Sequence, residues 1–390
     1  MRETLGVWPP LPIVLRVYSY KTWGDSNIVA ALEHNNRICE VDLFDIPSRQ
    51  LELVLQEMQQ SFPELTNLRL GCDDETAPDV PASFLGGSAP RLRTLFLDYI
   101  SFPGLPKLLL SATHLVDLDL WRIPFAGYIS PEAMVTCLSG LTRLKRLDIG
   151  FESPQSRPDR RRPHPMTRTL LPVLSKLRFI GADEYFEDLV AQIYTPLLDE
   201  LAITFFHQLM FDTPKLAQFI SHTPKLTTHN EARVVFSDGD VSVTFPRTYD
   251  GTLELGISCR EPDWQLFSLA QVCSSSFPQA LIPAIERLYI LEDGFPRLHW
   301  QDDIENSQWL DLLRPFSGVK NLYISREFVP RIVPALQELV EEIVIEVLPA
   351  LESLFLEEPL LSGHVPKTIG QFVVARQRAH FTIAVYFWER

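Results

Sequence analysis

Apolar residues recur along the chain in one short pattern, Leu-x-x-Leu-x-Leu, in which other large apolar residues can replace leucine. Two clear copies run from Leu92 to Leu97 and from Leu115 to Leu120. The last two apolar positions of each copy are two residues apart, so a strand there points both side chains to one face. The residues between and beyond them then lie on the opposite face.

The same spacing is found over nearly the whole sequence. Copies begin at Ile38, Leu65, Leu92, Leu115, Leu144, Leu174 and Leu198, and again at Ile285, Val319 and Leu351. The first seven starts are separated by 27, 27, 23, 29, 30 and 24 residues. This spacing is typical of a repeat protein in which each repeat is one small structural unit.

The segments between the copies carry apolar residues at helical spacing behind recognisable helix starts. Such starts are Ser48, Ser130 with Pro131, Thr213 with Pro214, Asp263 and Ser307. Strands joined by right-handed crossovers through helices pair in parallel. The sequence therefore predicts an α/β fold, a leucine-rich repeat solenoid. It would be a curved horseshoe with a parallel sheet on the concave side and irregular helices on the convex side.

The repeats extend to both ends of the chain, with two interruptions. We expect a first strand at 13–18 followed by a helix at 25–34, and a closing strand at 381–387. Residues 232–245 indicate two strands joined at Asp238-Gly239, and 252–257 a third, without a helix between them, so the register of 226–260 stays open. Residues 152–169 are rich in proline and arginine and predict a flexible basic loop. We interpret 1–390 as one domain of about 12 to 13 irregular repeats.

Composition limits the possible partners. The formal net charge of -15 disfavours nucleic acid and anionic membranes, because it repels phosphates, and favours partners with basic surfaces. Five scattered cysteines suit a reducing compartment. Prolines interrupt the apolar N-terminal run, so we expect neither a signal peptide nor a membrane span. A monomer in the cytoplasm or nucleus is the resulting expectation.

Common enzyme motifs are missing from the sequence, including the nucleotide-binding glycine loops, His-Glu-x-x-His and Gly-x-Ser-x-Gly. The densest histidines, His207, His222 and His229, have no cysteine or carboxylate at ligand spacing, so neither a metal nor a cofactor is expected. Asp117 and Asp119 are interpreted as outward positions of a strand. We expect a protein that is not an enzyme. A catalytic site assembled from distant repeats stays an alternative.

The outward residues of the predicted strands form the candidate binding surface. Successive strands stack about 4.8 Å apart, so these residues form one continuous surface. Aromatic residues are frequent there among carboxylates, a mixture typical of protein-binding hot spots. The candidate partner-binding residues are Phe44, Phe96, Asp98, Asp119, Trp121, Tyr289, Tyr323 and Phe355. Alternatively, loops or an opposite wall cover these rings.

The repeats PRLRTLFL, THLVDLDLW, TRLKRLDI and ALESLFL, with phrases such as FLGGSAPRL and LLSATHL, resemble the leucine-rich repeat portion of fungal (basidiomycete) F-box proteins. The resemblance implies repeats that hold a substrate for ubiquitination, and a helical F-box that binds the adaptor of a cullin ubiquitin ligase. Because the first strand is expected by Ile13, the F-box itself is expected to be missing. The chain is then either a scaffold that binds a protein or peptide without the ligase, or a ligase substrate receptor truncated at its N-terminus. It would bind the adaptor only if an F-box lies upstream.

Overall fold

The computed structural model describes residues 11–18, 25–74, 76–154, 168–246, 251–293, 305–341, 347–357, 367–378 and 382–389. The chain divides into two compact units, Met1–Leu198 and Asp199–Arg390. The interpretation of 1–390 as one domain stays a prediction. Most of the expected basic loop at 152–169 lies outside the described residues.

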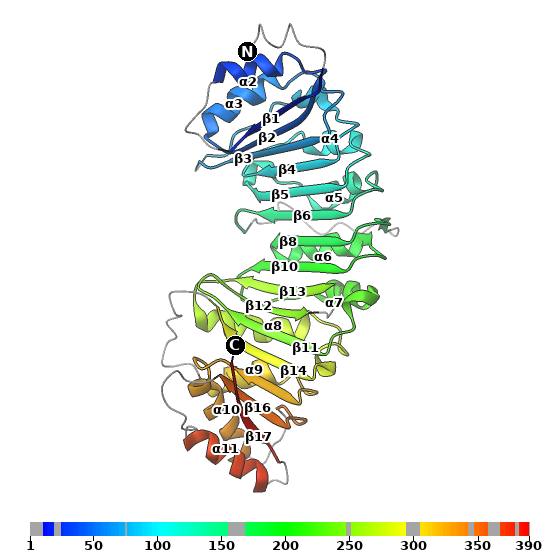
Figure 1. The fold of residues 1–390 in the computed structure, drawn as a ribbon. Coiled ribbons are helices and arrows are strands. Elements are labelled where there is room, and N and C mark those ends of the chain that lie inside the picture. Colours follow the sequence, from blue (N-terminus) through cyan, green and yellow to red (C-terminus); the bar gives the residue numbers. More distant parts are fainter. Residues whose placement is uncertain are drawn as a thin grey trace. The chain divides into compact units, whose positions relative to one another are not determined.

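The first unit consists of parallel strands that pair in chain order, with helices on one face (Figure 1). The strands are β1 (Ile13–Val17), β2 (Ile38–Ile46), β3 (Asn67–Cys72), β4 (Thr94–Asp98), β5 (Asp117–Ile123), β6 (Arg146–Phe151) and β8 (Lys176–Gly181). The helices are α2 (Asp25–Leu32), α3 (Ser48–Glu57), α4 (Leu105–Ser111), α5 (Pro131–Leu138) and α6 (Asp183–Gln192), with short 3-10 turns at Phe84–Gly87 and Phe125–Gly127. Two short strands, β7 (Thr169–Leu170) and β9 (Ile193–Tyr194), pair separately.

The leucines of the repeated pattern form the core between the strands and the helices. Leu95, Leu118 and Leu147 are register partners on neighbouring strands, and none of them is exposed. Helix α5 begins as predicted, because the Ser130 hydroxyl accepts a hydrogen bond from the backbone N–H of Ala133 at 3.2 Å. The predicted leucine-rich repeat architecture is therefore confirmed in this unit.

Three repeats have a left-handed residue within one position of the end of their strand, and the sequence pattern does not reveal it. Asp45, Tyr99 and Arg122 have φ values of 56°, 55° and 46°, and each stands two residues after the last apolar position of its triplet. The strand register shifts at Asp45 and at Arg122. Such a bulge turns the following backbone and redirects the side chain of the bulged residue.

The second unit also contains a strand-and-helix repeat, but its chain order is changed in the middle. Its strands are β10 (Glu200–Phe206), β11 (Glu231–Phe236), β12 (Asp240–Pro246), β13 (Thr252–Ser258), β14 (Arg287–Glu292), β15 (Asn321–Ile324), β16 (Ser353–Glu357) and β17 (Ala384–Trp388). Its helices are α7 (Pro214–Ser221), α8 (Pro262–Ser275), α9 (Asn306–Leu313), α10 (Val329–Glu341) and α11 (Lys367–Arg378), with 3-10 turns at Pro224–Leu226 and Ile282–Ala284.

Strands β11, β12 and β13 confirm the three helix-free strands expected at 232–257. They run in the spatial order β10, β13, β12, β11, β14, so β13 pairs with β10 and β11 pairs with β14. Strand β12 is antiparallel to both of its neighbours. Because the antiparallel β12 lies between β11 and β13, these two strands stay parallel to the rest of the unit although no helix connects them. This arrangement settles the register left open at 226–260.

Some expected helix starts and one strand differ in detail. Helix α3 has Pro47 rather than Ser48 at its N-cap, and the Ser48 N–H donates to the carboxylate of Asp74 in the next repeat. The Thr213 hydroxyl makes no capping bond because it donates to the Ser276 hydroxyl at 2.6 Å. The closing strand is Ala384–Trp388, displaced from the expected 381–387, of which 381 lies outside the described residues. Among the helices that the structure describes, none is both long and apolar enough to cross a membrane.

Candidate functional site

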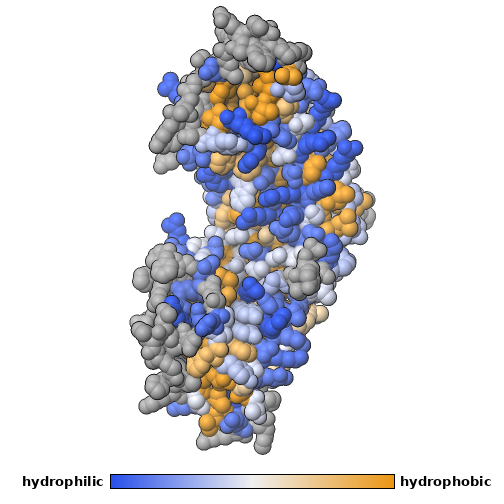
Figure 2. All heavy atoms as spheres, viewed as in Figure 1, coloured by the Kyte–Doolittle hydropathy of each residue, from blue (hydrophilic) through white to orange (hydrophobic). Residues whose placement is uncertain are grey.

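The predicted partner-binding residues all lie on strands and face away from the helices. Phe44 lies in β2, Phe96 and Asp98 in β4, Asp119 and Trp121 in β5, Tyr289 in β14, Tyr323 in β15 and Phe355 in β16. The first five belong to the first unit and the last three to the second. Figure 2 shows a hydrophilic band across the strands of the first unit, and apolar residues over the last strands of the second. The two groups therefore offer different chemistry.

One outward row in the first unit contains charged side chains of both signs and one aromatic ring. We call it the middle row, and its residues, in register from β1 to β8, are Arg16, Asp42, Arg69, Phe96, Asp119, Asp148 and Arg178. The Arg69 guanidinium lies over the Phe96 ring at 5.0 Å, and that of Arg178 lies over the Trp121 ring at 4.8 Å. Cation–π contacts of this kind hold both arginines against the sheet.

Two of the predicted aromatic residues lie over glycines of the next strand. The Phe44 ring covers Gly71, where an added Cβ would be 2.6 Å from the Phe44 Cδ2 atom. The Phe44 and Phe96 ring centroids are 5.9 Å apart. The Trp121 ring lies beside Gly150 in the same way, with Cε3 3.5 Å from an added Cβ. The glycines therefore make room for rings that lie along the sheet surface.

Asp98 is held by an internal ion pair. Its two oxygens accept hydrogen bonds from Nε and Nη2 of Arg122 at 2.6 and 2.9 Å, and its residue exposure is 9%. Arg122 also donates to the Cys72 carbonyl at 3.0 Å and lies 5.3 Å from the Tyr99 ring centroid. The left-handed backbone of Arg122 is what places the guanidinium there. Asp98 thus fixes the position of Arg122.

Asp119 is the most perturbed carboxyl of the candidate set. Burial raises its pKa to about 7, and the neighbouring Asp148 carboxylate adds to the rise. Asp148 is the register partner of Asp119 and is itself bound by Arg146, whose Nη2 lies 2.7 Å from Asp148 Oδ2. The Oδ1 atom of Asp119 is buried and has no hydrogen-bond partner within the described part of the chain. Asp119 is therefore a half-buried carboxyl poised to titrate near neutral pH.

The predicted aromatic residues of the second unit form a continuous stack. The ring centroids of Tyr289 and Tyr323 are 4.2 Å apart, those of Tyr323 and Phe355 are 4.3 Å apart, and the rings are tilted by only 10° and 11°. Tyr386 of β17 extends the stack at 5.1 Å from Phe355. We call these four residues the aromatic stack. Arg233 of β11 lies 5.5 Å from the Tyr289 ring centroid and ends the row.

Trp388 lies edge-on against the aromatic stack. Its ring centroid is 5.7 Å from that of Tyr323 and 6.2 Å from that of Tyr289, at interplanar angles of 85° and 75°. The Nε1 atom of Trp388 is buried without a hydrogen-bond partner among the residues described. Sequence reasoning did not assign Arg233, Tyr386 or Trp388 to the surface. Correct registration of β17 with β16 would have revealed Tyr386 opposite Phe355.

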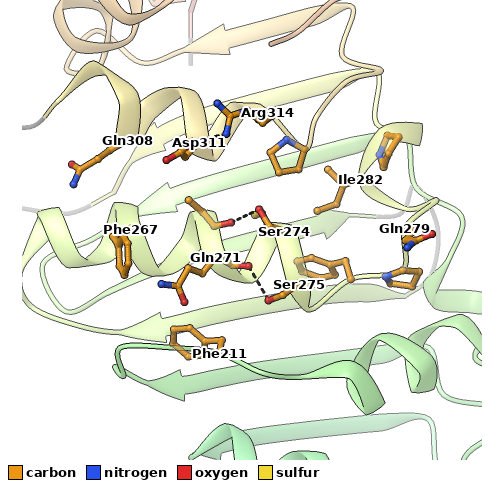
Figure 3. A pocket seen from close by; sticks show the side chains of 16 residues that line it. Phe211, Phe267, Gln271, Ser274, Ser275, Gln279, Ile282, Gln308, Asp311 and Arg314 are labelled. Carbon is orange, nitrogen blue, oxygen red and sulfur yellow. Dashed lines mark hydrogen bonds and ion pairs between the residues drawn. The ribbon is translucent and has the colours of Figure 1, made fainter. Parts of the chain in front are cut away.

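A groove of about 650 Å³ lies on the helix side of the second unit, between α8 and α9 (Figure 3). It is lined by Phe267 and Gln271 of α8, Gln308 of α9 and Phe211. The Asp311–Arg314 ion pair of 2.8 Å lies at the C-terminal end of α9, where Arg314 is the C-cap. Its lining combines rings and prolines with neutral amides and hydroxyls. Burial raises the pKa of the Cys273 thiol, so this cysteine is not an activated nucleophile. No sequence pattern indicated this groove.

The three histidines singled out in the sequence have separate partners. The Nδ1 atoms of His207, His222 and His229 lie 3.2 Å from the Ser268 hydroxyl, 2.7 Å from the Gln218 carbonyl and 3.4 Å from the Pro246 carbonyl, respectively. Over the described ranges, no group of three or more histidine, cysteine or acidic side chains is placed to hold a metal ion.

Parallel strands, leucine core and interleaved helices define a protein of the leucine-rich repeat class. Among solved structures, this chain is similar to the leucine-rich repeat-containing protein LegL7 from Legionella pneumophila, with 11% sequence identity and a TM-score of 0.34 over 93% of this chain and 97% of that chain. At these values the similarity carries no argument about function. No family model and no curated protein matches the chain.

Proposed function

We propose that this protein is a non-enzymatic scaffold that binds a protein or peptide on the helix-free face of its strands. The observation that carries the proposal is the aromatic stack, which lies on this face and continues to Tyr386 at the end of the chain. Tyr386 is 49% exposed, and Tyr289, Tyr323 and Phe355 are half-buried beside it. Exposed, contiguous apolar surface of this kind usually marks an interaction site.

The geometry of the stack suits contact with a polypeptide. The faces of Tyr323 and Phe355 are covered by neighbouring rings, so a ligand meets ring edges and the tyrosine hydroxyl groups. Side chains already ordered by stacking lose little conformational entropy on binding. Tyrosine and tryptophan supply much of the energy of protein interfaces for this reason.

The first unit offers a second surface with more charge. Phe96 and Trp121 are half-buried rings, and Asp119 stands beside Trp121 on β5. Rings surrounded by charged groups give a ligand both apolar contact and orientation. We therefore include Phe44, Phe96, Asp119 and Trp121 in the proposed binding surface, with Asp98 as the residue that positions Arg122.

Selection from a random peptide library against the folded protein tests the proposal. Peptides that bind the second unit should lose about 30-fold in affinity on Tyr323→Ala, because an aromatic hot spot contributes about 2 kcal/mol. Peptides that bind the first unit should lose as much on Trp121→Ala. Arg314→Ala, on the helix side of the second unit, is the matched control and should leave the affinity unchanged.

Peptides that keep their affinity for Tyr323→Ala and Trp121→Ala but lose it on Arg314→Ala would refute the proposal. Such peptides would place the binding site in the groove between α8 and α9. Circular dichroism of each variant shows whether a loss of binding reflects a loss of folding.

The repeat phrases PRLRTLFL and THLVDLDLW support a second candidate, a substrate receptor of a cullin-type ubiquitin ligase. In this role the same surface holds the protein to be ubiquitinated, and an F-box binds the adaptor. Co-purification with the adaptor tests it. The chain can be extended to include any F-box encoded upstream. If the extended chain still fails to bind the adaptor, this role is excluded.

A further inference from the structure

A polar hollow of about 300 Å³ lies on the helix-free face at the beginning of the first unit. Arg16, Glu40, Asp42, Asn67 and Arg69 are among its lining residues and come from β1, β2 and β3. None of them belongs to the candidate residues that the sequence indicated. The hollow therefore needs its own explanation.

Asp42 is a buried carboxylate that is only half satisfied. Its residue exposure is 4%, and its Oδ2 atom accepts a hydrogen bond from the Tyr18 hydroxyl at 3.0 Å and lies 3.6 Å from Arg69 Nη1. The Oδ1 atom is buried and has no partner in the described part of the structure. Glu40, in contrast, is bound by Arg16 Nε at 2.5 Å. A buried acceptor left without a donor is costly, so Asp42 Oδ1 marks a place for a ligand donor.

The same feature recurs further along the middle row. Asp119 also has a buried Oδ1 atom without a partner among the described residues. Asp42 lies on β2 and Asp119 on β5, in one register row, so the two carboxylates are three strand spacings, about 14 Å, apart. Arg69 and Phe96 fill the row between them.

We propose that the middle row binds an extended peptide that crosses the strands and carries two basic side chains four residues apart, one at Asp42 and one at Asp119. An extended chain rises about 3.4 Å per residue, so residues i and i+4 are about 14 Å apart and point to the same side. This inference rests on the proposed function and names the chemistry of its ligand.

Charge supports the same ligand. The net charge of -15 favours the approach of a basic peptide. Glu40 and Arg146, which lie beside the row, neutralise Arg16 and Asp148, and Arg69 lies 3.6 Å from Asp42. Asp119 has no direct ion pair in the described part of the chain. The central residue of the peptide, i+2, faces Arg69 and Phe96, where a third cation would be repelled. An uncharged or acidic residue is expected there.

Three fluorescent synthetic peptides test the proposal by fluorescence anisotropy at low salt and pH 8, where Asp119, whose pKa is raised to about 7, is ionised. The first is Gly-Ser-Lys-Thr-Val-Thr-Lys-Ser-Gly, the second has the same composition with its lysines three residues apart, and the third has glutamine in place of both lysines. The first should bind at least about ten times more tightly than either of the others, because only its lysines reach both carboxylates.

Asp42→Asn and Asp119→Asn should each weaken the first peptide about tenfold, since each removes one charged hydrogen bond. Asp238→Asn is the matched control. It removes the same charge at the exposed turn between β11 and β12, where Asn-Gly also forms a turn, and it should leave the affinity unchanged.

Equal binding of the two lysine spacings by the wild-type protein would overturn the proposal, and this comparison needs no variant to fold. Equal weakening by Asp238→Asn would overturn it as well, because the attraction would then be non-specific. The library selection tests the proposed function separately. Suppose that selected peptides lose affinity on Trp121→Ala but keep it on Asp42→Asn. This result would refute the two-carboxylate site and leave the proposed binding face supported.

Discussion

Asp119 should make the stability of the protein depend on pH, and Asp119→Asn should remove that dependence. Burial, reinforced by Asp148, raises the pKa of Asp119 from 3.8 to about 7 in the folded protein. Between these two values the folded state binds a proton that the unfolded state releases. The free energy of unfolding therefore falls as pH rises from 3.8 to about 7.

The size of the effect follows from the displacement of the pKa. The full displacement of the pKa corresponds to a loss of about 4 kcal/mol in the free energy of unfolding at pH 8, and to no loss below pH 3.8. Asp119 keeps part of its contact with water, and screening reduces the cost, so about 1 to 2 kcal/mol is the expected contribution. The asparagine variant cannot ionise. Relative to the wild type, it should gain about two-thirds of this amount in stability between pH 5 and pH 8, because the remaining third of the fall occurs below pH 5.

Urea unfolding followed by circular dichroism at pH 5 and pH 8 measures this difference. The comparison between the two pH values matters more than either value alone, because asparagine also changes the hydrogen bonding of the site. Asp238→Asn, at an exposed turn, should show no comparable change with pH. A stability difference between wild type and Asp119→Asn that is the same at both pH values would refute the argument.

The remaining predictions concern packing. Leu118→Ala should reduce the free energy of unfolding by about 2 to 5 kcal/mol, because it leaves a cavity at a fully buried core position. Trp121 faces outward, so Trp121→Ala should reduce it by less. Equal losses of the two variants in thermal unfolding would show that Trp121 belongs to the core. Gly318→Ala should cost about 2 to 3 kcal/mol, because its Cβ would lie 2.0 Å from the Pro283 carbonyl oxygen. Gly370→Ala on α11 has open space and is the control; a neutral Gly318→Ala would contradict this reasoning.

The spacing of apolar residues was sufficient to predict most of the fold. A leucine such as Leu118 at alternating strand positions must be buried, so the strands and their inward faces follow from local sequence. The order of β11, β12 and β13 could not be predicted in this way. All three have the same alternating pattern, and their order depends on which edges of β10 and β14 they meet, a choice made between residues far apart in the sequence.

The candidate surface was predictable where register alone decides it. Tyr289, Tyr323 and Phe355 occupy equal positions in successive repeats, so parallel pairing stacks them. The Asp98–Arg122 pair was not predictable, because it needs the left-handed backbone at Arg122, which a count of positions would place on a regular strand. The half-satisfied Asp42 could not be found from sequence either, since burial and a missing donor are properties of assembled neighbours.

The positions of the polar groups indicate why a repeat surface can be specific without a deep pocket. In a parallel sheet the outward residues stand in rows about 4.8 Å apart, so the spacing between two groups is fixed by the number of strands between them. Asp42 and Asp119 are held three strands apart by a leucine core that tolerates little change. A ligand that matches this spacing gains both contacts, and one that does not gains only one. The core therefore determines which ligands the surface can distinguish.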